Sequence, residues 1–428
     1  MINRVEPSQK SSNEQPGSRV VELARSLIQA PSPNPPGDER AVAQVIIDAL
    51  RDRDMADVEI LSKEDARPNL LTTLEFGPGG QHLCLSGHMD TKPVGEARWG
   101  VDPFEGSMKD GQLYGLGSCD MKGALAAMIE AASVLKASDL SAGRLSLLFT
   151  ADEENASSYG SRFLIDVLDR IPDAMIIGEP GGIHQDWDRL HLLGRGIANF
   201  RVRVFGDQGH SSLSATFGLV NASVEMAKLL VAFAEGFTPR HSEHPLVPEG
   251  PTVNAGVRVQ GGVGYGVVPG EAEFACDVRV VPGMSRSLLE EDLKDFLGQQ
   301  MNANPQLHCS FEFEPDPTGW LPPSEIASTD PVASAAREAM RRMIERVPPD
   351  SAFPGTTDAA WFCGRLGIPT LPALGPGLLR RAHAADEYVS VNSIETAARI
   401  YAEAGRLFCA GRPLPPSRES SYPDGEAE

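Results

Sequence analysis

Cysteine is scarce in this sequence, and its six copies are not spaced as disulfide or metal motifs are. They stand at positions 84, 119, 276, 309, 363 and 409, without a CxxC pair among them. Disulfide frameworks and thiolate zinc sites depend on such paired spacing. The sequence therefore predicts neither of them, and we expect a protein of the reducing cytoplasm.

Clusters of basic residues and long apolar runs are missing as well. The formal net charge is −21 and no basic block stands out against it, so nucleic acid is not expected as a partner. No apolar stretch approaches the length of a membrane span, and the first residues lack the apolar core of a signal peptide. We therefore expect a soluble protein that has no membrane partner.

The chain does have length and an ordinary globular composition. Its 428 residues exceed what one hydrophobic core usually organises, so two domains are expected. Because 41% of the residues are apolar and 23% are charged, there is ample material for a buried core.

Helical and strand-like patterns alternate through the first 194 residues and return after Pro323. Amphipathic helices are expected over 18–29, 39–53, 121–136 and 393–408, and strand-like apolar runs at 69–74, 82–86, 145–150 and 174–177. Such alternation predicts an α/β domain with a mostly parallel sheet and helices on its faces.

The pattern changes near Gly194. The order there is strand, helix, strand, strand, helix and strand, over 200–205, 217–235, 252–259, 271–281, 286–301 and 307–314. This is the order of a ferredoxin-like α+β unit. We therefore expect residues 195–311 to be inserted into a domain formed by 18–194 and 312–412. The polar segments 1–17 and 413–428 are expected to be disordered.

His88 and Asp90 directly follow a short apolar run that stops at Gly87. Ligands and catalytic groups of α/β sheets collect just past the carboxyl ends of the strands. Imidazole is a common metal ligand, and a carboxylate two residues away can accept its second N–H. In isolation the pair is more often an ordinary loop feature, so its significance depends on whether other motifs share this setting.

Three carboxylate motifs and a second histidine have similar settings. Asp120 opens a helix after a glycine-rich loop, Glu153 and Glu154 follow one apolar strand, Glu179 follows another, and His383 lies in a loop of small residues. The loop before Asp120 nearly matches a dinucleotide-binding motif, but Asp120 replaces its third glycine. An N-cap role for Asp120 and a surface acidic turn for the two glutamates remain open alternatives.

The combined set of imidazoles and carboxylates suits two zinc, cobalt or manganese ions. Two such ions a few ångströms apart can activate a water molecule that they share and polarise a carbonyl group. One glutamate of the pair Glu153 and Glu154 would then be free to act as the general base.

The motifs GHMDT, GLGSCDMKG, TADEE, GEP, GTTDA and AHAADE, in this order, resemble those of the M20 metallopeptidases. That family includes acetylornithine deacetylase, succinyl-diaminopimelate desuccinylase, aminoacylase and the glutamate carboxypeptidases. The resemblance extends from Pro31 to His383. It implies a catalytic domain with an inserted lid and dimerisation domain, and therefore a homodimer.

The resemblance also implies a role for each site residue. Asp120 would bridge two zinc ions, with Glu154 and His383 completing one site and His88 and Glu179 the other. Asp90 would orient His88. Glu153 would take a proton from the bridging water and pass it to the leaving amine.

In the inserted unit, the resemblance implies a catalytic or substrate-binding role for three residues. His210 matches a histidine that reaches the partner subunit's active site and stabilises the oxyanion. Asn254 and Arg279 match positions that hold the carboxylate of the substrate. Gly266 replaces a frequent asparagine of the family, which puts one local substrate or backbone contact in doubt.

We therefore expect a binuclear metal-dependent hydrolase that cleaves the amide bond of an N-acyl amino acid with a free carboxylate. Dipeptidase or carboxypeptidase activity is the alternative. A binding protein without catalysis is disfavoured because Glu153 is present. A dinucleotide-dependent oxidoreductase is disfavoured because Asp120 interrupts the glycine motif.

Overall fold

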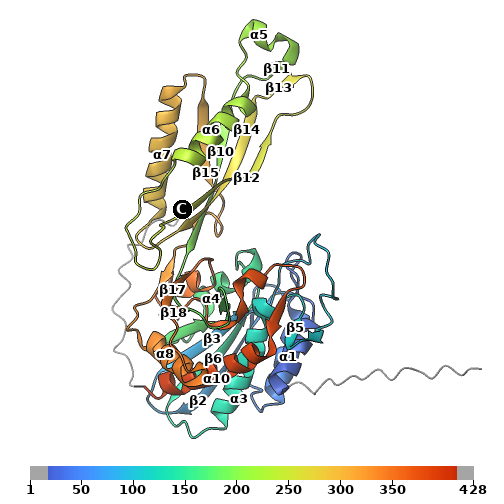
Figure 1. Cartoon of the computed structure of the whole chain (residues 1–428), viewed down its shortest axis with the longest axis vertical. Helices are drawn as coiled ribbons and strands as arrows, with labels where there is room; N and C mark the ends of the chain where they lie inside the picture. Colours follow the sequence, from blue (N-terminus) through green and yellow to red (C-terminus); the bar gives the residue numbers. More distant parts are fainter. Residues whose placement is uncertain (1–17, 412–428) are drawn as a thin grey trace, which may run out of the picture.

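A computed structural model describes residues 18–411, and Figure 1 shows its two parts. The larger part contains the central sheet and both ends of the described chain. The smaller part, which we call the lid, contains the elements from β10 to β15 and projects away from the larger one. The segments 1–17 and 413–428, for which we expected disorder, lie outside the described residues.

The larger part is organised around a six-stranded sheet of order β1-β2-β6-β3-β7-β18. β3 pairs in parallel with β6 and β7, and β18 pairs in parallel with β7, while β1 and β2 are antiparallel. The mostly parallel sheet is therefore confirmed. The strands are β1 (Glu59–Ser62), β2 (Pro68–Gly77), β3 (His82–His88), β6 (Gly143–Thr150), β7 (Ala174–Ile177) and β18 (Thr370–Leu371).

Helices cover both faces of this sheet, which explains why every residue of β3 is buried. Side chains of β3 alternate between the two layers: Leu83 and Leu85 join the main core, and Cys84 joins a smaller one. The main core is formed with α1 (Arg19–Ile28), α2 (Arg40–Arg51), α3 (Gly123–Lys136), α8 (Pro331–Ile344) and α10 (Val391–Cys409). The smaller core is formed with α4 (Ser161–Val167) and α9 (Ala359–Phe362).

The register of the parallel strands brings their carboxyl ends to one edge. His88 lies opposite Thr150 of β6, and Ser86 lies opposite Ile177 of β7. The loops that follow these three strands therefore start side by side, at the edge where sites form in sheets of this kind.

The lid is a four-stranded antiparallel sheet with two helices on one face. Its order is β12-β14-β10-β15, the order of a ferredoxin-like unit. The elements are β10 (Gly196–Phe205), α6 (Ala222–Gly236), β12 (Thr252–Gly261), β14 (Glu271–Val280), α7 (Arg286–Ala303) and β15 (His308–Phe313). The expected boundary between residues 311 and 312 therefore falls inside β15.

The helix expected over 217–235 begins later than the sequence suggested. The short helix α5 (Ser214–Phe217) ends at Gly218, whose φ is 63°, and α6 begins at Ala222. Asn221 caps α6, because its side chain accepts the amides of Ser223 and Val224. The helix itself is confirmed, but its expected start at residue 217 was wrong, because a glycine stop at Gly218 and an N-cap at Asn221 precede it.

Several short pairings complete the fold. They comprise β4 (Met108–Lys109), β5 (Gln112–Tyr114), β8 (Pro180–Gly182), β9 (Leu190–Gly194), β11 (Gly209–His210), β13 (Val267–Val268), β16 (Ser324–Glu325), β17 (Asp350–Phe353), β19 (Gly375–Leu378) and β20 (Tyr388–Ser390). Within residues 18–411, no single helix is both long and apolar enough to cross a membrane.

The lid has its own hydrophobic core, and Phe233 lies at the centre of it. This ring stacks on Phe237 at 4.4 Å and makes edge contacts with Phe200, Phe274 and Phe296. We expect Phe233→Ala to lower the free energy of unfolding of the lid by about 3–5 kcal/mol, because it leaves a cavity among packed rings. Urea denaturation followed by circular dichroism would measure this loss.

Val231→Ala is the matched control, since Val231 lies on the same helix and is 56% exposed. Its effect should stay within about 0.5 kcal/mol. Equal losses for the two variants would contradict the central place of Phe233 in the lid core.

Candidate metal centre

The motifs singled out in the sequence meet at the edge where β3, β6 and β7 end. His88 Nε2 lies 3.0 Å from Asp120 Oδ1 and 3.5 Å from Glu179 Oε1. His383 Nε2 lies 3.2 Å from Asp120 Oδ2 and 3.1 Å from Glu154 Oε1. The ligand atoms thus form two groups, each within 4.8 Å, that share Asp120 through its two different oxygens. This donor set of imidazole and carboxylate groups fits a pair of divalent cations.

Asp120 is placed by the turn Ser118–Lys122 that precedes α3. The Glu387 carboxylate accepts the amides of Gly117, Cys119 and Asp120 at 2.9, 2.8 and 3.0 Å, and so fixes this turn. The alternative of an N-cap is wrong, because α3 begins at Gly123 and the Asp120 side chain caps nothing. Glu387 itself was not assigned a role from sequence, although it is the last residue of the AHAADE motif that contains His383.

Asp90 connects His88 to the acidic turn. The imidazole Nδ1 lies 2.9 Å from the Asp90 carbonyl oxygen and 3.5 Å from its Oδ1, so the carbonyl is the nearer acceptor. The Asp90 carboxylate accepts the amides of Glu153 and Glu154, both at 3.1 Å. Asp90 therefore orients the ring mainly through its backbone, while its side chain holds the two glutamates.

Glu153 belongs to neither ligand group, whereas Glu154 belongs to one. Burial raises the pKa of Glu153 well above its usual value; the nearby His88 opposes this shift, and the carboxylates of Glu179 and Glu154 add to it. A carboxylate that stands beside the ligands and has a raised pKa accepts a proton more readily than an ordinary carboxylate does, as a general base requires. Lys92, not foreseen from sequence, forms an ion pair with Glu154 at 3.1 Å.

In the metal-free chain, protons offset the repulsion among these carboxylates. Hydrogen bonds to Asp120 and Glu154 raise the pKa of His383 to about 10. Burial and the charge of Asp120 raise the pKa of Glu179 to about 8. Burial lowers the pKa of His88, but hydrogen bonds to Asp120, Asp90 and Glu179 outweigh this effect and raise the pKa well above its usual value.

The lid residues predicted to take part lie apart from this cluster. His210 is exposed on β11 at the far tip of the lid, and its Nδ1 accepts the Ser212 amide (Figure 1). Asn254 is exposed on β12 opposite Asp277, and Arg279 pairs with the Asp277 carboxylate at 2.9 Å. Within one chain, the structure does not bring these three side chains to the two ligand groups.

Asn254, Asp277 and Arg279 share the face of the lid sheet that its helices leave open. Along β14, Cys276, Val278 and Val280 are buried, whereas Asp277 and Arg279 between them are partly exposed. Arg279 pairs in register with Ile197, near the start of the lid. These polar groups therefore lie at the end of the lid sheet next to the larger part.

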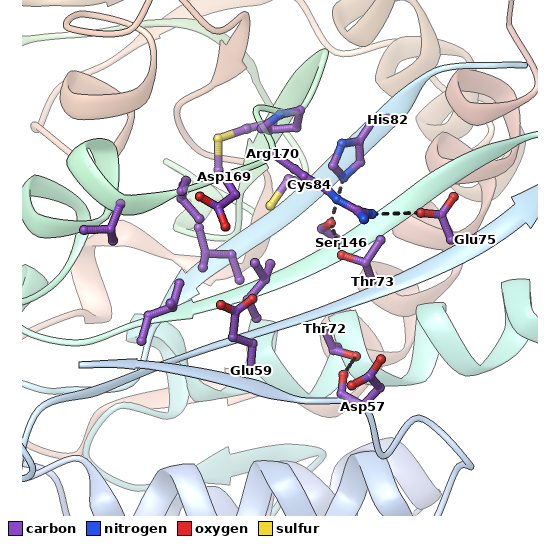
Figure 2. Close-up of a pocket in the computed structure, with 17 residues that line it drawn as sticks. Asp57, Glu59, Thr72, Thr73, Glu75, His82, Cys84, Ser146, Asp169 and Arg170 are labelled. Carbon is purple, nitrogen blue, oxygen red and sulfur yellow. Dashed lines mark hydrogen bonds and ion pairs between the residues drawn. The ribbon is translucent and has the colours of Figure 1, made fainter.

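A separate cavity of about 510 Å³, whose lining residues Figure 2 shows, lies on the face of the sheet that carries the smaller core and includes His82 at the amino end of β3. Part of its polar lining is paired internally: His82 Nε2 contacts Ser146 Oγ at 2.7 Å, and Arg170 contacts Glu75 at 3.2 Å. Among the described residues, neither candidate metal group lines this cavity. We therefore do not assign the chemistry to it.

Comparisons with known proteins agree with this geometry. The model of peptidase family M20/M25/M40 matches residues 84–406. The chain is 30% identical over 407 residues to a succinyl-diaminopimelate desuccinylase of Parvibaculum lavamentivorans, covering 92% of this chain and 96% of the relative. It is 31% identical over 356 residues to an acetylornithine deacetylase of Pasteurella multocida, covering 82% and 87%.

Solved structures share the fold at lower sequence identity. An M20 family metallo-carboxypeptidase from Sulfolobus solfataricus has a TM-score of 0.71 at 18% identity, covering 91% of this chain and 99% of that one. A Bacillus subtilis protein described as a dinuclear metal binding peptidase of the M20 family has a TM-score of 0.65 at 18% identity, covering 91% and 98%. These likenesses support the α/β fold with an inserted domain.

The raised pKa values of the metal-free site predict that metal binding releases protons. At neutral pH the His383 and Glu179 side chains, with pKa values of about 10 and about 8, hold protons that a divalent cation must displace, and the raised pKa of His88 favours a proton there as well. We expect Zn²⁺ to release about two to three protons per filled chain at pH 7, and its affinity to rise between pH 6 and 7.5. Calorimetric titration in buffers of different ionisation enthalpy would count these protons. A count near zero would contradict the protonation of these three side chains.

Proposed function

Because the chain belongs to peptidase family M20/M25/M40, we propose that it hydrolyses the amide bond of an N-acyl amino acid, as a deacetylase or desuccinylase does. The observation that carries this proposal is the pair of ligand groups that share Asp120, with Glu153 beside them but in neither. The names of the relatives support the substrate class, since one removes a succinyl group and the other an acetyl group.

The chain's own residues supply the ligands and the proton transfer. His88, Glu179, Asp120, Glu154 and His383 would hold two divalent ions, which we propose to be zinc. Such ions lower the pKa of a water molecule between them and polarise the substrate carbonyl. Glu153 would accept the proton of that water and then deliver it to the nitrogen of the leaving amine. The Asp90 contacts with both glutamate amides keep Glu153 in place for these two transfers.

We propose that Asn254 and Arg279 bind the free carboxylate of the substrate. Both lie on the open face of the lid sheet, and the planar guanidinium can hold a carboxylate through two parallel hydrogen bonds. The Asp277 carboxylate forms an ion pair with one nitrogen of the Arg279 guanidinium. Substrate binding would therefore exchange one carboxylate partner of Arg279 for another.

We also propose that the protein is a homodimer in which the lid tip completes the site of the other subunit. His210 is exposed at the tip of the lid. Large apolar side chains in the segments that follow β11 and β12 are exposed as well: Phe217 is 69% exposed and Val263 75%. The neighbouring strand β12 is an edge strand with free hydrogen-bonding groups on one side. In this arrangement His210 of the partner subunit would stabilise the oxyanion.

Two further expectations remain our proposals. All six cysteines are unpaired, which supports a reducing cytoplasmic location. The separate cores support a division of the chain into a metal-binding domain and an inserted domain, and the whole of β15 belongs to the inserted domain because Phe311 and Phe313 both pack against its core.

The proposal is tested by assaying amine release from N-succinyl, N-acetyl and N-formyl amino acids and from dipeptides. We expect release that a chelator abolishes and added Zn²⁺ restores. Glu153→Gln should retain its metal and lose about 10²–10⁴-fold in kcat, because the proton acceptor is gone. Glu75→Gln, a change in an exposed pair, is the control and should stay near wild type. Cleavage of dipeptides alone would favour the peptidase alternative.

The dimer proposal predicts complementation between two inactive variants. Glu153→Gln and His210→Ala would each inactivate both sites of their own homodimer. After refolding as an equal mixture, half of the dimers would be mixed, and one site of each would be intact. We expect about a quarter of the wild-type activity to return if subunits assort at random. No recovery from a mixture shown to contain mixed dimers would contradict a role for His210 across the interface.

A further inference from the structure

The turn that carries Glu153 and Glu154 is held in an unfavourable backbone conformation. Asp152 before it has a φ of 64°, and Ala156 and Ser157 after it have φ values of 75° and 56°. Residues other than glycine rarely adopt this left-handed region, and they remain there only when surrounding contacts hold them. The acidic turn therefore needs an anchor outside itself.

The Asp152 side chain provides the attachment point for that anchor. It is 1% exposed and belongs to neither metal-ligand group. Its Oδ1 accepts hydrogen bonds from Arg67 Nη2 at 2.8 Å and Asn34 Nδ2 at 2.9 Å, and its Oδ2 accepts the Tyr159 amide at 3.1 Å. The Asp152 carboxylate therefore holds the backbone next to Glu153 and Glu154 in place.

Arg67 is itself immobilised on several sides. Its side chain is 6% exposed, its Nε donates to Glu39 Oε2 at 2.8 Å, and its guanidinium carbon lies 5.2 Å from the centre of the Tyr159 ring. Gly37 leaves the space for this group, since a Cβ there would lie 2.0 Å from Arg67 Nη1. The guanidinium therefore holds Asp152 from a fixed position.

Asn34 joins this anchor to the second support of the turn. Its Nδ2 donates both to Asp152 and to Asp90 Oδ2, the latter at 2.8 Å. Asp90 in turn accepts the amides of Glu153 and Glu154. The turn is thus held at the preceding side chain by Arg67 and at its own amides by Asp90, with Asn34 bonded to both supports.

We propose that Arg67 is a positioning residue for the general base: through Asp152 it fixes the turn that sets where the Glu153 carboxylate lies. The proposal rests on the proposed function in so far as Glu153 is the base. The anchor itself is a property of the folded chain.

The test compares Arg67→Met with Arg53→Met in the metal-loaded protein. Arg53 is a suitable control because its side chain is 4% exposed and pairs with Glu130 at 3.1 Å in the same domain, with no bond to the acidic turn. Both variants lose a buried ion pair, so both should be less stable. Hydrogen exchange of a peptide spanning residues 150–160 reports on the turn without any need for turnover.

We expect Arg67→Met to raise the exchange of this peptide about tenfold or more, whereas Arg53→Met leaves it unchanged. In folded, metal-loaded enzyme, kcat should fall roughly 10²-fold, with KM changed less than about threefold, because a displaced base slows only the chemical step. Arg67→Lys keeps the charge and one donor, so it should recover part of both properties. It also serves as the test variant if Arg67→Met fails to fold.

Unchanged exchange and unchanged kcat in folded Arg67→Met would overturn the proposal, as would the same result in Arg67→Lys where Arg67→Met does not fold. Loss of a metal ion with normal exchange would also overturn it, since the effect would then be on a ligand and not on the turn. If wild type cleaves none of the amides but Arg67→Met still loosens the turn, the proposed function fails while the anchor stands.

Discussion

The mutual repulsion of buried carboxylates at one edge of a parallel sheet dominates this structure. Asp90, Asp120, Asp152, Glu154 and Glu179 converge where three strands end, and water is largely excluded from them. Each needs a compensating partner, because an unpaired buried charge is costly. Asp90 accepts hydrogen bonds from two backbone amides, and Asp152 forms an ion pair with Arg67. Glu154 forms an ion pair with Lys92, and the two histidines contact Asp120.

This division of partners determines which acids remain available for chemistry. The carboxylates of Asp90 and Asp152 accept hydrogen bonds from other groups of the protein, and they hold the turn of Glu153 and Glu154 in place. Asp120, Glu154 and Glu179 instead meet histidines, whose protons a cation can replace. The supporting acids thus surround an inner group of acids and histidines whose donor atoms fit a cation.

The sequence allowed most of the fold and the central site to be predicted for a simple reason. An apolar run followed by a polar residue marks the end of a buried strand, and parallel strands align those ends. His88, the pair Glu153 and Glu154, and Glu179 could therefore be grouped from their positions in the sequence alone, whereas the choice of Glu154 as the ligand came from the family resemblance. The roles of Arg67 and Glu387 could not be predicted, because each acts on a segment far away in sequence. Arg67 lies in no distinctive local pattern, and the AHAADE motif that ends in Glu387 does not indicate which amides its carboxylate accepts. The lid tip could be recognised as a motif, but the path that carries His210 away from the cluster depends on tertiary structure.

The placement of the lid within the chain also affects how the protein is made. Glu179 precedes the lid and His383 follows it, so the ribosome must synthesise the whole lid before the last histidine emerges. The lid has its own core and can fold during that interval. The centre that includes His383 can therefore be completed only near the end of synthesis, and a nascent chain holds its early ligands without the full site.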